Sequence, residues 1–156
     1  MDKAALHREL VSTLERELQT LVAAQRLSSE GVTHADAKAD GIKDMRATEA
    51  SYIARGQALR VSALREDLDR VAAMKPRSFA AEDAIALSAV VTLVDGEEHE
   101  TRVFLAPAGG GTTLGELRVI TPASPLGRAL LGKRVEDITE VVRGGATSEL
   151  EIVAVE

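Results

Sequence analysis

The sequence predicts an α+β protein: an antiparallel coiled-coil hairpin of two long helices, followed by a small, mainly antiparallel β domain with one short helix. Two observations lead to this fold class. In the first half, apolar residues recur at steps of three and four, the period of a helix. After Lys75-Pro76 the period becomes two, as in strands, and proline cannot continue a helix. We therefore expect a helical finger at residues 1–75 and a β domain at residues 78–156.

Two apolar seams of equal length define the predicted helices, one from Lys3 to about Leu27 and the other from Thr48 to about Met74. Each helix alone would leave its seam in water, whereas an antiparallel hairpin buries both. Matching the seams end to end places the chain reversal near Gly41. The seam residues are Val11, Leu14, Leu18 and Leu21 in the first helix, widened by Leu6 and Leu10, and Val61, Leu64, Leu68 and Val71 in the second.

The second half alternates apolar and polar residues in short runs, which is typical of strands. Turn residues separate these runs: Asp95-Gly96 and Gly144-Gly145 predict hairpin turns, and Gly109–Gly111 predicts a flexible hairpin loop. The predicted strands are Ser88–Val94, His99–Ala106, Glu116–Thr121, Asp137–Val142 and Glu149–Val155.

One short helix is predicted between the strands. Ser124 can cap its first turn, and Pro125 suits the first helical position. Gly132 suits the end, because glycine adopts the left-handed conformation that closes many helices.

Composition and charge exclude several classes of protein. The net charge is −6, and it is uneven: residues 1–77 carry 13 basic and 12 acidic side chains, whereas residues 78–156 carry 6 and 13. Neither half has the basic face of a DNA-binding domain, so we expect a protein partner with basic surface and no sequence-specific DNA binding. With no cysteine there is no thiolate chemistry. The aromatic residues, Tyr52, Phe79 and Phe104, are too few for base stacking or an aromatic pocket.

The sequence gives no sign of a membrane segment. Its start has no apolar signal core, and the longest apolar-rich run, Ile85 to Val94, is too short to span a bilayer. We expect a cytoplasmic protein.

Three aspartates, Asp36, Asp40 and Asp44, gather at the predicted tip of the finger around Gly41. Two interpretations are open. The acids are solvent-facing charges, with Asp44 capping the second helix, or they are hard oxygen ligands that the finger delivers to a metal ion. A complete metal site within the chain is not expected, because lysines stand among the acids.

The segment 119-VITPASPLGRALLGKRVEDITEVV-142 resembles the C-terminal domain of the Gre family of bacterial transcript cleavage factors, GreA and GreB. The resemblance is specific in this motif and looser, at the level of architecture, over the rest of the chain. The residues that carry it are Ser124, Pro125, Leu130, Leu131, Gly132, Lys133 and Asp137.

The resemblance implies an FKBP-like fold for the β domain and docking on bacterial RNA polymerase through the motif. The docking residues it implies are Ser124, Pro125, Gly132 and Lys133. It further implies that the coiled coil enters the polymerase secondary channel. The protein is then a monomeric stimulator of the polymerase's own activity and not an enzyme. Prolyl isomerase activity is not expected, because Phe104 is the only aromatic residue after Phe79.

In the Gre family, acidic residues at the tip help to hold a magnesium ion shared with the polymerase, and this shared site cleaves backtracked RNA. Here we expect Asp40 and Asp44 to take that role, with support from Asp36 or Glu49, although they stand about one helical turn nearer the tip than the family's acidic positions. Two carboxylates on a rigid rod suit this chemistry, because magnesium prefers oxygen ligands.

The tip also departs from the family pattern, an Asp-x-x-Glu-Asn block followed by a Glu-Tyr pair. In 44-DMRATEASY-52, Met45 and Thr48 stand at the acidic positions and Ser51 precedes Tyr52. A second hypothesis therefore keeps channel binding without cleavage, which makes the protein an inhibitor or modulator of polymerase. A third, from another class, makes the helices a dimerisation element of a structural protein.

Arginines follow the tip on the second helix. In the functional interpretation Arg46 and Arg55, with Arg60, contact the 3′ end of the nascent RNA. In the alternative they form a solvated helix face, because their spacing does not keep all three on one side.

Overall fold

The computed structural model describes residues 2–35, 43–143 and 145–156; for residues 29–35, 43–47 and 143 it describes the backbone alone. The chain divides into two compact units, one made of Met1–Val11 with Asp67–Glu156 and the other of Ser12–Glu66. The division predicted at residues 75–78 coincides with the end of a helix. As a domain boundary it stays a prediction.

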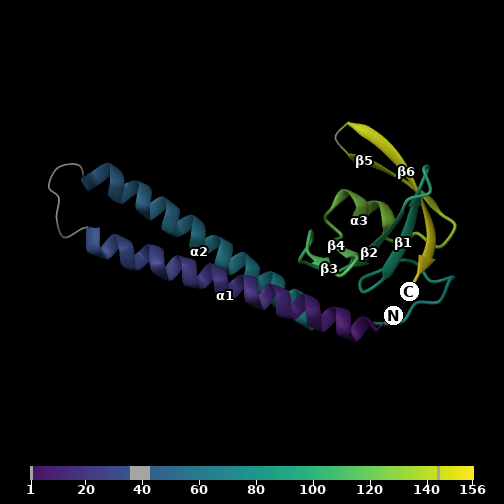
Figure 1. The fold of residues 1–156 in the computed structure, drawn as a ribbon, viewed down its shortest axis with the longest axis horizontal. Helices are drawn as coiled ribbons and strands as arrows, with labels where there is room; N and C mark the ends of the chain where they lie inside the picture. The colour runs from purple at the N-terminus through teal and green to yellow at the C-terminus, as the bar shows by residue number, and fades with distance from the viewer. Residues whose placement is uncertain (1, 36–42, 144) are drawn as a thin grey trace. The chain divides into compact units, whose positions relative to one another are not determined.

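Two long antiparallel helices form the first part of the chain, α1 (Lys3–Ala35) and α2 (Lys43–Ala73) (Figure 1). Asp2 caps α1, since its Oδ1 accepts a hydrogen bond from the Ala5 N–H at 2.9 Å. Both helices extend further towards the predicted tip than the apolar pattern indicated. Apolar periodicity reports only an apolar face, and a helical backbone can continue beyond the end of such a face.

The buried residues of the helical pair belong to the predicted seam, but only part of that seam is fully buried. Four seam residues are buried: Leu10, Leu14, Val61 and Val71. The others are half-buried: Leu6, Val11, Leu18, Leu21, Leu64 and Leu68. Leu10 lies in the compact unit that contains the sheet. Nearby, His7 Nε2 lies 2.7 Å from the Val71 carbonyl oxygen, which connects α1 to the last turns of α2.

The second part of the chain forms a six-stranded sheet with the strand order β3-β4-β2-β1-β6-β5. The five predicted strands are confirmed, and β3 is an additional short strand that the alternation did not reveal. All strand pairings in the sheet are antiparallel except that of β2 with β4, which is parallel. The strands are β1 (Val90–Asp95), β2 (Glu100–Leu105), β3 (Thr113–Leu114), β4 (Leu117–Ile120), β5 (Ile138–Arg143) and β6 (Ala146–Val155).

The glycine segment Gly109–Gly111 is not a hairpin loop, contrary to the sequence-based prediction. Because β4 is parallel to β2 and antiparallel to β3, the chain reverses at these glycines and again between β3 and β4, and the strand that pairs with β2 is β4 and not β3. Gly111 has φ +93° and donates its N–H to the Val119 carbonyl at 2.9 Å. Local alternation could not show this, since it does not report which strands pair.

The helix α3 (Pro125–Leu130) packs against one face of the sheet (Figure 1). Leu126 and Leu130 from α3 join a core of strand residues that includes Val103 and Ile152. The opposite face is also buried in its middle, where Phe104 is fully enclosed. In the described residues, neither long helix carries an apolar stretch sufficient to cross a membrane.

Candidate functional site

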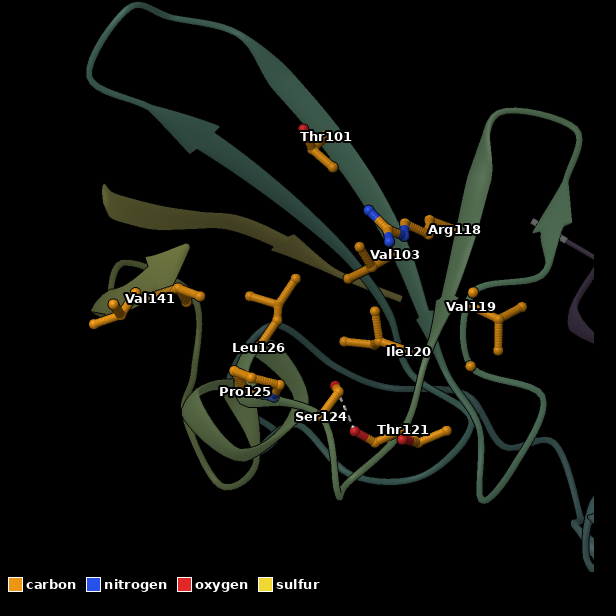
Figure 2. Close-up of a pocket in the computed structure, with 13 residues that line it drawn as sticks. Thr101, Val103, Arg118, Val119, Ile120, Thr121, Ser124, Pro125, Leu126 and Val141 are labelled. Carbon is orange, nitrogen blue, oxygen red and sulfur yellow. Dashed lines mark hydrogen bonds between the residues drawn. The ribbon is translucent and has the colours of Figure 1, made fainter. Parts of the chain in front are cut away.

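A cleft of about 510 Å³ opens between α3 and the face of the sheet that α3 covers (Figure 2). Its floor is apolar and comes from the core. Its rim is polar and comes from strand ends and from the turn before α3. The floor residues are Val103, Ile120, Leu126 and Val141, and the rim includes Thr101, Arg118, Thr121, Ser124 and Pro125.

The turn that begins α3 forms one wall of the cleft and is built around Ser124. Its hydroxyl donates to the Thr121 carbonyl at 2.8 Å and accepts the Gly127 N–H at 3.0 Å. A Cβ on Gly127 would lie 1.9 Å from the Thr121 carbonyl oxygen, so this position admits no side chain. The predicted roles of Ser124 as N-cap and Pro125 at the first helical position are confirmed. The Ser124 hydroxyl thus serves the fold.

Arg118 is the only charged side chain among the described residues that line the cleft. It lies on β4 and pairs in register with Val103, so both occupy the same face of the sheet. Sequence reasoning missed Arg118, because it treated this strand only as an element of the fold. The available signal was a single arginine within the otherwise apolar run Leu117–Ile120.

No aromatic side chain stands among the described lining residues. Phe104 occupies the register position beside Val103 and therefore points to the other face, where it is completely buried. The cleft offers an apolar floor, hydroxyl groups and one guanidinium at its rim. Such a lining suits an apolar side chain of a partner held next to an acidic or carbonyl group.

Gly132 and Lys133, in the second half of the segment that resembles the Gre family, hold a neighbouring loop through backbone hydrogen bonds. Gly132 has φ +79°, as expected at a helix end, and its N–H donates to the Ile85 carbonyl at 2.9 Å. The Ile85 N–H donates in turn to the Lys133 carbonyl at 2.8 Å. Among the four predicted docking residues, the cleft brings together Ser124 and Pro125, and the lining excludes Gly132 and Lys133.

The predicted tip falls largely outside the described residues. This applies to Asp36, Asp40 and Gly41, while Asp44 and Arg46 lie on α2 with only their backbone described. Their assignment as metal or RNA ligands stays a prediction. Within the part of the chain that was searched, no group of three or more His, Cys, Asp or Glu side chains could hold a metal ion.

Glu49 and Arg55 are both exposed on α2. They stand six positions apart, which at about 100° per residue leaves them roughly 120° apart around the helix axis. The structure therefore puts the supporting carboxylate and the candidate RNA ligand on different sides of α2.

Two side chains in the described residues have shifted acidity, and neither lines the cleft. Hydrogen bonds from the backbone N–H groups of His99 and Glu97 lower the pKa of Asp95, the last residue of β1. Partial burial lowers the pKa of Lys3, opposed by the Glu156 carboxylate. Lys3 and Arg77 lie 4.4 Å and 4.2 Å from the Phe79 ring centre, which ties the start of α1 to the segment after α2.

Comparison with known proteins places the chain among transcription elongation factors. The family model for the C-terminal domain of the transcription elongation factor GreA/GreB matches residues 80–156. Transcription elongation factor GreA of Paracoccus denitrificans (strain Pd 1222) is 30% identical over 159 residues, which covers 99% of this chain and 98% of the relative. Transcription elongation factor GreA of Rickettsia bellii (strain OSU 85-389) is 34% identical over 73 residues, or 47% of this chain and 45% of the relative.

Because the similarity to a GreA protein extends over almost the full length of both chains, this protein belongs to the GreA/GreB family. Among solved structures, the GreA factor homolog 1 (Gfh1) protein of Thermus thermophilus is 25% identical. It covers 96% of this chain and 94% of its own, with a TM-score of 0.42.

Proposed function

We propose that this protein binds bacterial RNA polymerase, inserts its helical hairpin into the secondary channel and assists the cleavage of backtracked RNA. The observation that carries the proposal is the full-length similarity to a GreA protein. The helices are long enough for insertion into a channel, because the 31 residues of α2 extend roughly 45 Å at about 1.5 Å per residue. Such a rod is long enough to carry groups from a docking surface to a buried active site.

In this proposal the polymerase docks at the cleft beside α3 and at the neighbouring motif that contains Gly132 and Lys133. Ser124 and Pro125 shape its wall, Arg118 supplies a charge at its rim, and the apolar floor receives a partner side chain. Gly132 and Lys133 lie beside the cleft and take part through the loop that they hold. In this proposal the structural hydrogen bonds of Ser124 keep the cleft open, and the polymerase contacts the surface that results.

At the tip, Asp40 and Asp44 would hold a magnesium ion together with the polymerase, and Asp36 or Glu49 would support them. Carboxylate oxygens are suitable ligands for this ion, which supplies Lewis acidity to phosphoryl chemistry when it is bound. Arg46 and Arg55 would contact the nascent RNA near its 3′ end. The protein itself is then a stimulator and not an enzyme.

The test uses purified polymerase halted in a backtracked state on labelled RNA. Addition of the protein should shorten the RNA faster, and Asp40→Asn with Asp44→Asn should abolish this effect while polymerase binding persists. A matched control, Asp67→Asn with Asp69→Asn near the other end of α2, removes the same charge and should leave cleavage unchanged. RNA lengths that do not respond to the wild-type protein would reject the cleavage role.

A second function is favoured by one specific observation: Met45 and Thr48 stand where the family pattern has acids. In this alternative the protein occupies the channel and modulates polymerase without cleavage. Competition with nucleotide entry would raise the apparent KM for nucleotides during elongation, with the RNA length unchanged in halted complexes. An unchanged KM together with unchanged RNA lengths would contradict both functions.

A further inference from the structure

The outer edge of the sheet carries an unusual combination of charge and apolar surface. β5 is an edge strand, because it pairs with β6 alone (Figure 1). Its side chains alternate: Thr139 and Val141 are buried on the side of α3, whereas Ile138 and Val142 are 59% and 63% exposed on the other side. We call the exposed surface of Ile138, Glu140 and Val142 on β5 with Glu149 and Glu151 on β6 the acidic edge.

The charges of the acidic edge are not neutralised by described residues. Glu140 stands directly opposite Glu149, and Glu151 stands opposite Ile138. All three glutamates are exposed, and no ion pair joins any of them to another described residue. Like charges directly opposite one another destabilise a pair of strands, so this arrangement is a cost to the fold.

The backbone of β5 presents free hydrogen-bonding groups at the same place. The Ile152 N–H donates to the Asp137 carbonyl at 3.0 Å, which makes that pair a hydrogen-bonded one. Since bonded and non-bonded pairs alternate in an antiparallel ladder, the N–H and C=O groups of Ile138, Glu140 and Val142 point outwards. Lys133 Nζ lies 3.5 Å from the Ile138 carbonyl oxygen. No described residue bonds to the outward groups of Glu140 and Val142.

We propose that the acidic edge is a docking site for an extended, basic segment of another protein, which adds to the sheet as a strand beside β5. Main-chain hydrogen bonds to Glu140 and Val142 would hold the segment. Its lysine or arginine side chains would neutralise Glu140 and Glu149, and its alternate apolar residues would lie on the side of Val141. The inference is argued from β5 and β6, and its surface shares Val141 with the cleft in which polymerase docking is proposed.

Charge decides between the possible occupants. A second copy of the chain added antiparallel at β5 would bring its own glutamates against Glu140 and Glu149, which opposes such a pairing. Nucleic acids and anionic lipid surfaces are repelled for the same reason. A basic segment is the occupant whose charge complements this surface, and its binding should weaken as the salt concentration rises.

The probe for the test is a short capped peptide that alternates lysine and valine, added to the full chain labelled with ¹⁵N. We expect amide shifts to concentrate on β5, and hydrogen exchange of the Glu140 and Val142 amides to slow about tenfold or more as they become bonded. A peptide with glutamate in place of lysine should not bind. The same lysine peptide with prolines at alternate positions should also fail, because it lacks the donors of a ladder.

The variant Glu140→Gln with Glu149→Gln should weaken binding about tenfold. A control, Glu97→Gln with Glu116→Gln, removes the same charge elsewhere in the sheet domain and should leave binding unchanged. Unprotected Glu140 and Val142 amides at saturating peptide would overturn the proposal, as would equal loss of binding in both variants. A mass that doubles with concentration and depends on β5 would assign the edge to a second copy and would also overturn it.

Discussion

At the scale of single residues, a few side chains and glycines form the candidate docking cleft. Ser124 connects Thr121 to Gly127 through two hydrogen bonds, and the missing side chain of Gly127 lets these segments approach. The sequence singled out Ser124 as the cap and Pro125 as the start of the helix, but neither Thr121 nor Gly127. The sequence could not show that Thr121 and Arg118 lie at the same site, because the turn and the strand pairing bring them there.

Gly127→Ala tests the close approach at this turn. The new methyl group would overlap the Thr121 carbonyl, so the free energy of unfolding should fall by about 3 kcal/mol. Urea unfolding followed by circular dichroism measures the change. As a control, Gly56→Ala on α2 meets no atom within 4 Å and should raise the stability of the helix by about 0.5 to 1 kcal/mol. Equal effects of the two substitutions would contradict the close approach.

Asp95 gives a prediction about pH. Backbone N–H groups of His99 and Glu97 lower its pKa below the ordinary value of 3.8. A carboxyl group whose pKa is lowered on folding stabilises the fold at pH values above the unfolded pKa, and this contribution disappears as the pH falls through the folded pKa. Asp95→Ala should therefore reduce the urea midpoint near neutral pH, and the difference from wild type should shrink below pH 3.8. A difference that grows on acidification would contradict the assignment.

At the scale of elements, β5 and β6 combine an open edge with opposed glutamates. The sequence predicted both strands, but apolar and polar residue types do not separate the buried from the exposed positions of β5, since Ile138 and Val142 are exposed and Thr139 is buried. It could not show that Glu140 meets Glu149, because this depends on the register. Nor could it show that β5 lies at the edge, since strand order follows from pairings between distant segments.

Glu149→Lys tests the electrostatic cost of this arrangement. An opposite charge across from Glu140 should raise the free energy of unfolding by about 0.5 kcal/mol. The gain should diminish in high salt, because both groups are exposed. Glu116→Lys, which changes the charge equally in the turn after β3, serves as the control for net charge. A destabilised Glu149→Lys protein would show that the carboxylates are neutralised in another way.

At the scale of the whole molecule, one compact unit, Ser12–Glu66, consists of the two helices, and the other contains the sheet together with the remaining parts of both helices. Leu14 is 2% exposed in the unit Ser12–Glu66, where the two helices bury each other's seam. The core around α3 and the sheet lies within the other unit. A defect in the seam should therefore affect the helical pair first.

Leu14→Asp places an unpaired charge in the buried seam and should cost the helical hairpin about 4 kcal/mol or more. Hydrogen exchange should then show lost protection in residues 12–66, with the strands still protected. Ser12→Asp, on an exposed position of the same helix, is the control.

Light scattering over a dilution series of the wild type should give a constant monomer mass. A mass that falls on dilution would favour the dimerisation element instead.

The sequence by itself determined the local structure of this protein: two long helices with apolar seams, five of the strands, and a short helix capped by Ser124. These features follow from side-chain period and capping, which act between residues close in the chain. The tertiary structure decided the parallel pairing of β2 with β4, which seam residues are fully buried, the position of Arg118 beside the cleft, and the exposed edge at β5. Each of these depends on contacts between distant segments, and local patterns do not specify which segments meet.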